Sequence, residues 1–170
     1  ASHQRIHLRD IAQVLGKINR WGGHTILPYS VAQHCVIVSS LVEDARFKAA
    51  ALLHDASEAY MGGDFVSPVK RNIPDLASLE AGLEQAIEER FGLPQSILLA
   101  HEIKDADLLA LAWEFRDLTR AGRNGEPWPE PMSRFRDLLA GFPPLVPLEW
   151  QAAALLFFET AVSLGIKEIN

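Results

Sequence analysis

Residues 49–60 of the 170-residue chain read AAALLHDASEAY, an apolar helical run into which three chemically useful polar residues are set. Alanine, leucine and glutamate favour a helix, and we expect one that ends near Met61, just before a pair of glycines. On that helix His54 and Glu58 lie one turn apart, and Asp55 and Glu58 share a face. The stretch therefore predicts an imidazole and two carboxylates on one patch.

The adjacent His54–Asp55 pair indicates a metal site. The ordinary alternative is a pair satisfied inside the core, but burial among alanine and leucine is costly without partners. Neutral imidazole and carboxylate together suit a divalent transition metal such as Mn, Co, Fe or Zn. Because two adjacent ligands cannot hold a metal alone, we expect further ligands elsewhere in the chain.

His34 is the best candidate for a third ligand. A capping-box pattern from Ser30 to Gln33 begins a second predicted helix, and a short turn around Asp44 joins it to the helix of His54 as an antiparallel hairpin. His34 lies ten residues before Asp44 and His54 ten residues after it. At about 1.5 Å per residue both lie about 15 Å from the turn, level with each other. An isolated histidine on an apolar helix is nevertheless more often a hydrogen-bonded core residue.

Asp107 is the fourth candidate ligand, within a long helical pattern over residues 95–120. Leucine and alanine follow it, so it lies in apolar surroundings, whereas Asp105 follows Lys104 and is expected at the edge. Buried carboxylates are either paired or bound to metals. Asp107 is therefore either a partner of Lys104 or Arg116 or a metal ligand.

Two loops carry further candidate residues. The first predicted helix, residues 8–19, delivers Arg20 and Trp21 to a loop, where they are either a surface charge and a core anchor or contacts for a phosphate and a base. Asp64 and Lys70 lie in the loop after the His54 helix. They are either exposed charges or contacts for a substrate held beside the metal.

The rest of the sequence predicts a helical protein. A chain of 170 residues with 48% hydrophobic and 22% charged residues is ordinary for a globular domain. Further helical patterns cover residues 74–91, 132–139 and 148–164, and no segment reads as a strand. We expect one domain, residues 1–170, built as an all-α bundle of six or seven helices.

Charge and cysteine content narrow the expected partners. A formal charge of −6 argues against a surface that grips nucleic acid and favours small substrates. Cys35 is the only cysteine, and neither a secretory signal nor an apolar stretch of about 20 residues occurs. We expect a cytoplasmic protein with no membrane partner that forms a homo-oligomer, a dimer or larger.

The order of these residues resembles the HD-domain metal-dependent phosphohydrolases, whose signature is a histidine, a His-Asp doublet and a distant aspartate. The resemblance extends to the 5'-deoxynucleotidase branch and its phage and bacterial relatives. It covers roughly the first two thirds of the chain. The matching segments are INRW at 18–21, SVAQH at 30–34, LHDASEA at 53–59, GDFVSPVK at 63–70 and IKDAD at 103–107.

The resemblance implies a role for each candidate residue. Four of them would bind one divalent metal ion (Co, Mn, Zn, Fe or Mg), namely His34, His54, Asp55 and Asp107. Glu58 would position or deprotonate the attacking water, and Asp64 would act near the reacting phosphate. Arg20 and Trp21 would contact the nucleotide, and Lys70 is a further expected substrate contact.

The leading hypothesis is hydrolysis of a dNMP to a deoxynucleoside and phosphate. Release of triphosphate from a dNTP is a rival that needs the same ligands. A nucleotide-binding regulatory protein without turnover would lack a ligand or the glutamate, and all are present. A di-iron oxygenase would need more ligands, yet the spare histidines His24 and His101 lack ligand spacing. The chain carries no phosphate-binding P-loop, which favours hydrolysis over nucleotide-driven work.

Overall fold

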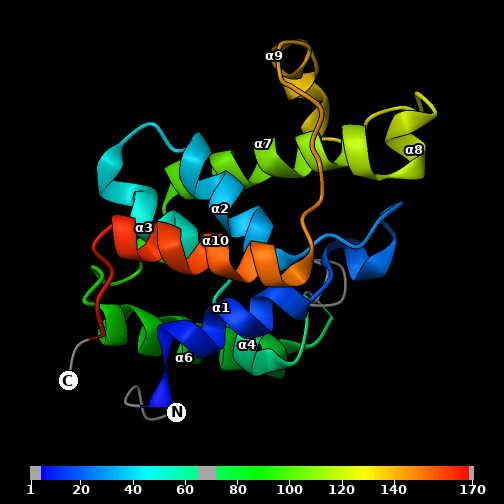
Figure 1. The fold of residues 1–170 in the computed structure, drawn as a ribbon. Coiled ribbons are helices and arrows are strands. Elements are labelled where there is room, and N and C mark those ends of the chain that lie inside the picture. Colours follow the sequence, from blue (N-terminus) through cyan, green and yellow to red (C-terminus); the bar gives the residue numbers. More distant parts are fainter. Residues whose placement is uncertain (1–4, 65–71, 169–170) are drawn as a thin grey trace.

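The computed structural model describes residues 5–64 and 72–168, and in these ranges the regular secondary structure is helical (Figure 1). The longer helices are α1 (Leu8–Lys17), α2 (Val31–Leu41), α3 (Ala45–Leu53), α6 (Pro74–Phe91), α7 (His101–Leu118) and α10 (Trp150–Ser163). The shorter elements are η2 (Arg20–Gly23), α4 (Glu58–Met61), η3 (Ile97–Leu99), α8 (Arg120–Arg123), η4 (Met132–Phe135) and α9 (Arg136–Leu139). The expected all-α fold is confirmed, since these ranges hold an isolated bridge between Asn19 and Ser30 but no strand.

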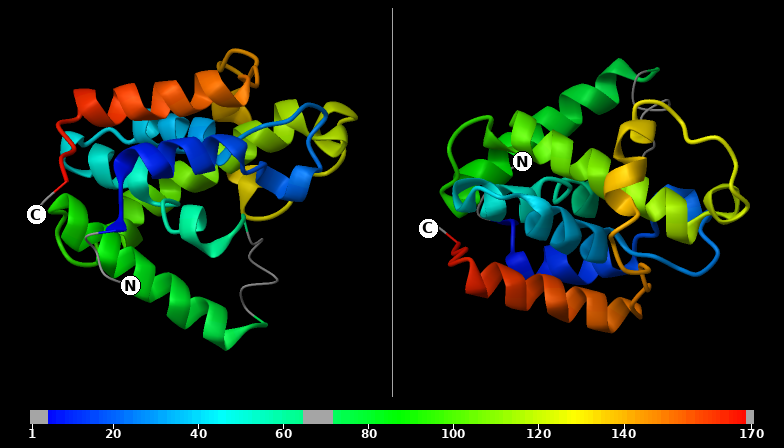
Figure 2. Two further views of the ribbon diagram at one scale, coloured as in Figure 1. Left: turned by 60° about the horizontal axis from the view of Figure 1, so that its bottom comes forward. Right: turned by 90° about the horizontal axis from the view of Figure 1, so that it is seen from above.

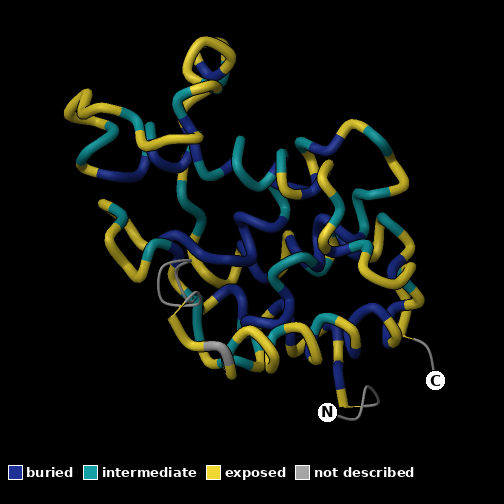
Figure 3. Tube along the Cα trace, turned by 180° about the vertical axis from the view of Figure 1, so that it is seen from behind, coloured by how far each residue is buried: buried dark blue, intermediate teal, exposed yellow. Residues whose placement is uncertain are grey.

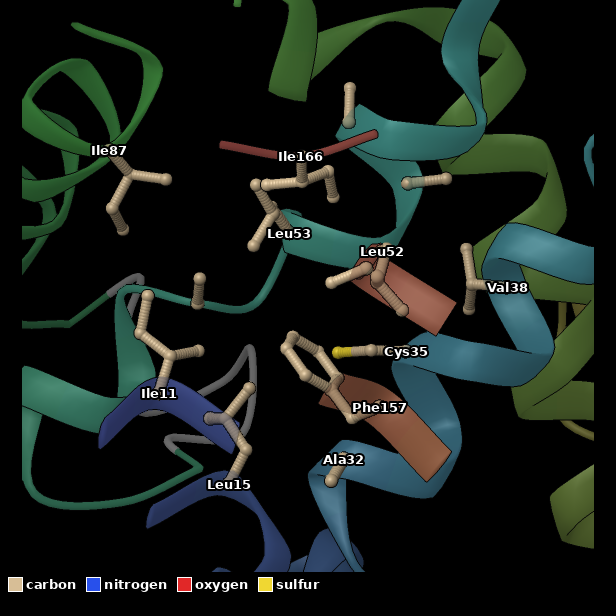
Figure 4. Packing of buried hydrophobic residues seen from close by; sticks show 14 of the residues in the cluster. Ile11, Leu15, Ala32, Cys35, Val38, Leu52, Leu53, Ile87, Phe157 and Ile166 are labelled. Atoms are coloured by element: carbon tan, nitrogen blue, oxygen red, sulfur yellow. The ribbon is translucent and has the colours of Figure 1, made fainter. Parts of the chain in front are cut away.

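The main core lies where α1, α2, α3 and α10 pack together. Figure 4 shows Phe157 of α10 beside Cys35 of α2 and Leu52 of α3, with Ile11 and Leu15 of α1 nearby. Burial of each large apolar side chain contributes about 1.5 to 3 kcal/mol, so this cluster holds the four helices together. Figure 3 shows the buried residues along the middle of the molecule and the exposed ones at its rim.

Helices α1 and α10 approach closely at Gly16. A Cβ atom on this residue would lie 2.8 Å from the backbone oxygen of Trp150 and 3.0 Å from the Cβ of Ala154. A larger residue would push the two helices apart, because interiors are close-packed. Figure 2 shows α1 and α10 side by side in both views, together forming one outer face of the molecule.

The second and third helices form the expected antiparallel hairpin. Asp44 is the N-cap of α3 and accepts a hydrogen bond from the backbone N–H of Arg46. The Ser39 hydroxyl donates across the hairpin to the carbonyl of Lys48 at 2.8 Å. These contacts fix the register of α2 against α3.

The capping box expected at the start of α2 forms only in part. The Ser30 hydroxyl accepts from the backbone N–H of Gln33, as a capping residue does. The Gln33 side chain does not turn back to Ser30. Its amide instead donates to the Val146 carbonyl and accepts from the backbone N–H of Leu148, both at 2.8 Å. Gln33 thus anchors the segment that leads into α10.

The prediction of one continuous helix up to Met61 is wrong. Helix α3 ends at Leu53, and residues 54–57 form tight turns before α4 begins at Glu58. The physical reason lies in His54, whose Nδ1 donates to the Ala51 carbonyl at 2.7 Å. In a continuing helix that carbonyl would accept the backbone N–H four residues further on. The His54 ring thus competes with the backbone for this acceptor at the point where α3 ends.

Among the described helices, none combines the length and the hydropathy that a membrane crossing requires.

Arg90 of α6 joins the segments before α1 and after α10. Its Nε donates to the Ile6 carbonyl at 2.9 Å, and its Nη2 lies 2.6 Å from the Glu168 carboxylate. The other oxygen of Glu168 accepts the backbone N–H of Leu8, the first residue of α1, at 2.9 Å. Partial burial would raise the pKa of Glu168, but Leu8, His7 and Arg90 hold it below its ordinary value.

We expect Glu168→Gln to lower the free energy of unfolding by about 1 to 2 kcal/mol, because it removes the charge from hydrogen bonds to Arg90 and Leu8. Urea unfolding followed by circular dichroism measures the difference. Glu149→Gln is a matched control, since the Glu149 side chain makes no capping hydrogen bond at the start of α10. Equal stability of the two variants would show that the Arg90 contact contributes nothing.

Candidate metal centre

Two histidines face each other across the α2–α3 hairpin. The rings of His34 and His54 lie 5.3 Å apart between centroids. His34 Nδ1 lies 2.6 Å from Oε1 of Glu114, and His54 Nδ1 lies 2.7 Å from the Ala51 carbonyl oxygen. A carbonyl or carboxylate oxygen only accepts, so both rings donate through Nδ1. Each therefore presents Nε2 to the space between them.

The two Nε2 atoms converge on the carboxylates of Asp55 and Asp107. Asp107 Oδ1 lies 3.0 Å from His34 Nε2 and 3.9 Å from His54 Nε2. Asp55 Oδ2 lies 3.2 Å from His54 Nε2 and 3.7 Å from His34 Nε2. Within the described ranges neither Nε2 atom makes a hydrogen bond. The structure thus brings the four predicted ligands close together, and two sets of three side chains there could hold a metal ion, His34 with His54 and Asp107, and Cys35 with His54 and Asp55.

Opposite charges in this cluster shift its pKa values strongly. Burial lowers the pKa of His54, but Asp55 and Cys35 together raise it well above the ordinary value. Burial and Arg20 lower the pKa of His34, and Glu114 and Asp107 raise it more. Burial raises the pKa of Asp55, but His54 and Arg20 lower it far below its ordinary range. The cluster therefore favours charged carboxylates beside a cation.

Exposure differs among the four residues. The Asp107 side chain is 40% exposed, whereas that of Asp55 is 18% exposed and that of His34 is fully buried. Asp107 is therefore the most solvent-exposed of the four candidate ligands.

Neither Lys104 nor Arg116, the alternative partners considered for Asp107, forms an ion pair with it among the described residues. Arg116 lies 2.7 Å from the carboxylate of Asp117, its neighbour in α7. Asp105 pairs with Arg134 at 2.7 Å and lies at the rim as expected, with its side chain 45% exposed. The expected burial of Asp107 is wrong, because its side chain is 40% exposed. The strongest described contact of Asp107 is with His34.

Glu58 and Asp64 lie on the segment that follows the cluster. Glu58 begins α4, is buried, and donates its backbone N–H to the Asp55 carbonyl at 3.1 Å. Asp64 is half-buried and close enough that its charge contributes to the raised pKa of Arg20. Lys70, the remaining predicted substrate contact, lies outside the described residues.

Arg20 is a buried part of the cluster rather than a surface charge. Its Nη1 lies 3.3 Å from Asp55 Oδ2, and its Nη2 lies 3.5 Å from Glu114 Oε2. Burial alone would lower the pKa of Arg20, but Glu114 and Asp55 raise it well above the ordinary value, so the charge is kept. In the described part of the chain its Nε has no hydrogen-bond partner.

Trp21 forms part of the wall beside Arg20. Its backbone is left-handed, with φ of 58°, and its indole Nε1 donates to Glu114 Oε2 at 2.9 Å. The ring packs 6.5 Å from that of Phe115, between centroids. Trp21 is therefore anchored in a small apolar cluster, as the core-anchor alternative predicts, and its role as a substrate contact stays a prediction.

Sequence reasoning missed Glu114 and Cys35. Glu114 is fully buried and contacts His34, Arg20 and Trp21. Its signal was the seven-residue spacing from Asp107, which places two acidic residues on one face of α7. The thiol of Cys35 groups with a ring nitrogen of His54 and an oxygen of Asp55, and burial raises its pKa to about 11.

Comparison with known proteins reveals relatives without an assigned activity. No family model matches the chain. The uncharacterized protein YfdR of Escherichia coli K12 is 44% identical over 113 residues, which cover 66% of this chain and 61% of the relative. An uncharacterized protein of Rhodobacter capsulatus is 38% identical over 120 residues, or 64% and 61%. The chain thus spans about three fifths of the length of these curated relatives.

The raised pKa values predict how stability depends on pH when metal is removed by a chelator. Folding raises the pKa of His34 and His54. Each histidine therefore stabilises the folded protein fully at a pH below its pKa in the unfolded chain, about 6.5, and this stabilisation is lost as the pH rises through its pKa in the folded protein. The melting temperature should therefore fall as the pH rises above about 6.5. Saturating Zn²⁺ should remove this fall, because deprotonated His34 and His54 then bind the cation.

The exposed ring of His101 supplies the control for this experiment. His101→Gln should leave the pH profile unchanged, whereas His54→Gln should flatten it. A wild-type profile with chelator that does not change above about pH 6.5 would contradict the charge assignment of the cluster.

Proposed function

We propose that the chain is an HD-type metal-dependent phosphohydrolase that converts a dNMP to a deoxynucleoside and phosphate. One observation carries the proposal. Two buried rings, each fixed through Nδ1, aim Nε2 atoms without hydrogen bonds at two carboxylates. Such an arrangement is unfavourable for neutral imidazoles unless a cation lies among the four groups.

The donor set fits a divalent transition metal. The ligands would be His34, His54, Asp55 and Asp107. Two imidazoles with two carboxylates suit Mn, Fe, Co or Zn better than Mg, because Mg prefers oxygen ligands. A metal bound here would acidify a water molecule and offset negative charge on the phosphate. Its positive charge would also offset the cost of burying two carboxylates that repel each other.

The surrounding side chains suit a phosphate ester. Asp107 is the most exposed of the four candidate ligands, so the ester would approach from its side. Arg20 keeps its charge and lies 3.3 Å from the Asp55 ligand, so its positive charge would attract a phosphate held beside the metal. Glu58 follows the Asp55 ligand by three residues and is assigned the role of accepting the proton of the attacking water. Asp64 would act near the same phosphate.

Trp21 supports a preference for deoxynucleotides. Its ring is rigid, and Glu114 and Phe115 hold it in place. A bulky indole packed against the sugar would exclude a 2'-hydroxyl, while its flat face tolerates several bases.

Assays of the purified protein with Mn, Co, Zn or Mg against dNMP, NMP and dNTP panels test the proposal. We expect inorganic phosphate from dNMPs and little from NMPs. Triphosphate released from dNTPs would replace the monophosphate assignment. Nucleotide binding without any product would overturn the assignment as an enzyme.

Neighbouring aspartates of α7 provide a matched test of the ligand set. Asp107→Asn should remove bound metal and activity together, because an incomplete set of ligands no longer holds the ion. Asp105→Asn should retain both, since Asp105 pairs with Arg134 at the rim. Metal content by atomic emission and phosphate release measure the two effects. Unchanged metal content in Asp107→Asn would rule out Asp107 as a ligand.

Glu58→Gln separates the catalyst from the ligands. We expect kcat to fall by about 10²-fold or more, the usual scale for loss of a general base, while metal content stays at the wild-type level. If metal is lost from Glu58→Gln, the residue is a ligand and the proton acceptor lies elsewhere.

A further inference from the structure

Glu114 connects two parts of the site that are far apart in sequence. Its Oε1 accepts from His34 Nδ1 of α2, and its Oε2 accepts from Trp21 Nε1 of η2. Arg20 Nη2 lies 3.5 Å from the same Oε2. The carboxylate is fully buried, so water does not substitute for any of these partners.

The turn that Glu114 holds is strained. Trp21, Gly22 and Gly23 have φ values of 58°, 55° and 81°, all in the left-handed region. Glycine adopts this conformation freely, but a bulky residue such as tryptophan does so only when the surroundings hold it there. Backbone bonds from Arg20 to Tyr29 and from His24 to Trp21 close the turn. The described hydrogen bond of the Trp21 side chain is the one to Glu114.

A glutamine in place of Glu114 would satisfy only one of the two ring donors. A carboxylate accepts at both oxygens, whereas an amide accepts at one end and donates at the other. An amide NH₂ facing His34 would force the ring proton from Nδ1 to Nε2, the atom aimed at Asp107. An amide NH₂ facing Trp21 would leave the indole N–H without an acceptor.

We propose that Glu114 is a positioning residue that couples the strained turn at residues 20–23 to His34, so that metal binding and the order of the turn rise and fall together. The coupling rests on the proposed function, in which His34 is a metal ligand and the turn holds the nucleotide. With Nε2 as the ligand atom, the His34 proton would stay on Nδ1 and its bond to Glu114 would strengthen. The carboxylate is then fixed as acceptor for Trp21, and the nucleotide meets a turn already in place.

Glu114→Gln tests the coupling, with Glu88→Gln as matched control. Glu88 is also buried, but its carboxylate accepts backbone N–H groups of Ser96 and Leu98, away from the metal cluster. Two measurements are made on each protein. Chelator competition gives the affinity for Zn²⁺, and NMR of protein with ¹⁵N-labelled tryptophan gives the hydrogen-exchange rate of the Trp21 indole N–H, assigned from its loss in Trp21→Phe.

We expect Glu114→Gln to weaken Zn²⁺ binding by about 10- to 100-fold and to speed indole exchange of Trp21 by about tenfold or more. Saturating Zn²⁺ should slow this exchange in the wild type and in Glu88→Gln, but not in Glu114→Gln. If Glu114→Gln matches Glu88→Gln in both measurements, Glu114 is structural only and the proposal is overturned.

Two further outcomes remain decisive. If Glu114→Gln does not fold, Trp21→Phe, which buries no new polar group, should still weaken Zn²⁺ binding by about threefold, and an unchanged affinity would contradict the coupling. If the wild type binds no Zn²⁺, the proposed function fails. Indole exchange in the metal-free proteins then still shows whether Glu114 holds the turn, and equal rates in wild type and Glu114→Gln would reject that as well.

Discussion

The candidate site depends on keeping two imidazole nitrogens close to two carboxylates where three helical elements meet. His34 and His54 each donate through Nδ1, so their Nε2 atoms face Asp55 and Asp107. This point lies where α2, the end of α3 and α7 meet, and each element contributes at least one of the four groups. Uncompensated burial of charge is costly, and the Arg20 guanidinium beside Asp55 and Glu114 offsets part of that cost. The apolar core beside it supplies the stability that such a cluster does not.

Much of the fold and the ligand set follows from local patterns in the sequence. Helical periodicity and the cap at Ser30 predict the α2–α3 hairpin, and counting from Asp44 predicts that His34 and His54 lie level. The end of α3 and the side chain of Gln33 were not predictable in this way. In both cases a side chain takes a specific backbone partner, at Ala51 or in residues 146–148, that helical propensity does not reveal.

The environment of the ligands is less predictable than the ligands themselves. Glu114 lies 80 residues from His34 in sequence, and only the packing of α7 against α2 brings them to 2.6 Å. Cys35 carries no local signal beyond following His34. For Trp21, the sequence left a core role and a substrate role as alternatives. Residue spacing does not reveal that the indole packs on Phe115 and donates a hydrogen bond to Glu114. Local pattern thus finds residues of unusual chemistry, while the partners that orient them come from distant parts of the chain.

The hairpin also bears on how such a protein can change over evolution. The turn at Asp44 lies at the far end of α2 and α3 from the two histidines, and the Ser39 to Lys48 contact fixes the register between turn and site. Residues inserted at the turn would extend away from the cluster without moving either ring. The hairpin can therefore change in length, or present a new surface at its turn, without a change in the positions of the two histidines. Residues 54–57 have no such freedom, since an insertion there would separate Asp55 from Glu58.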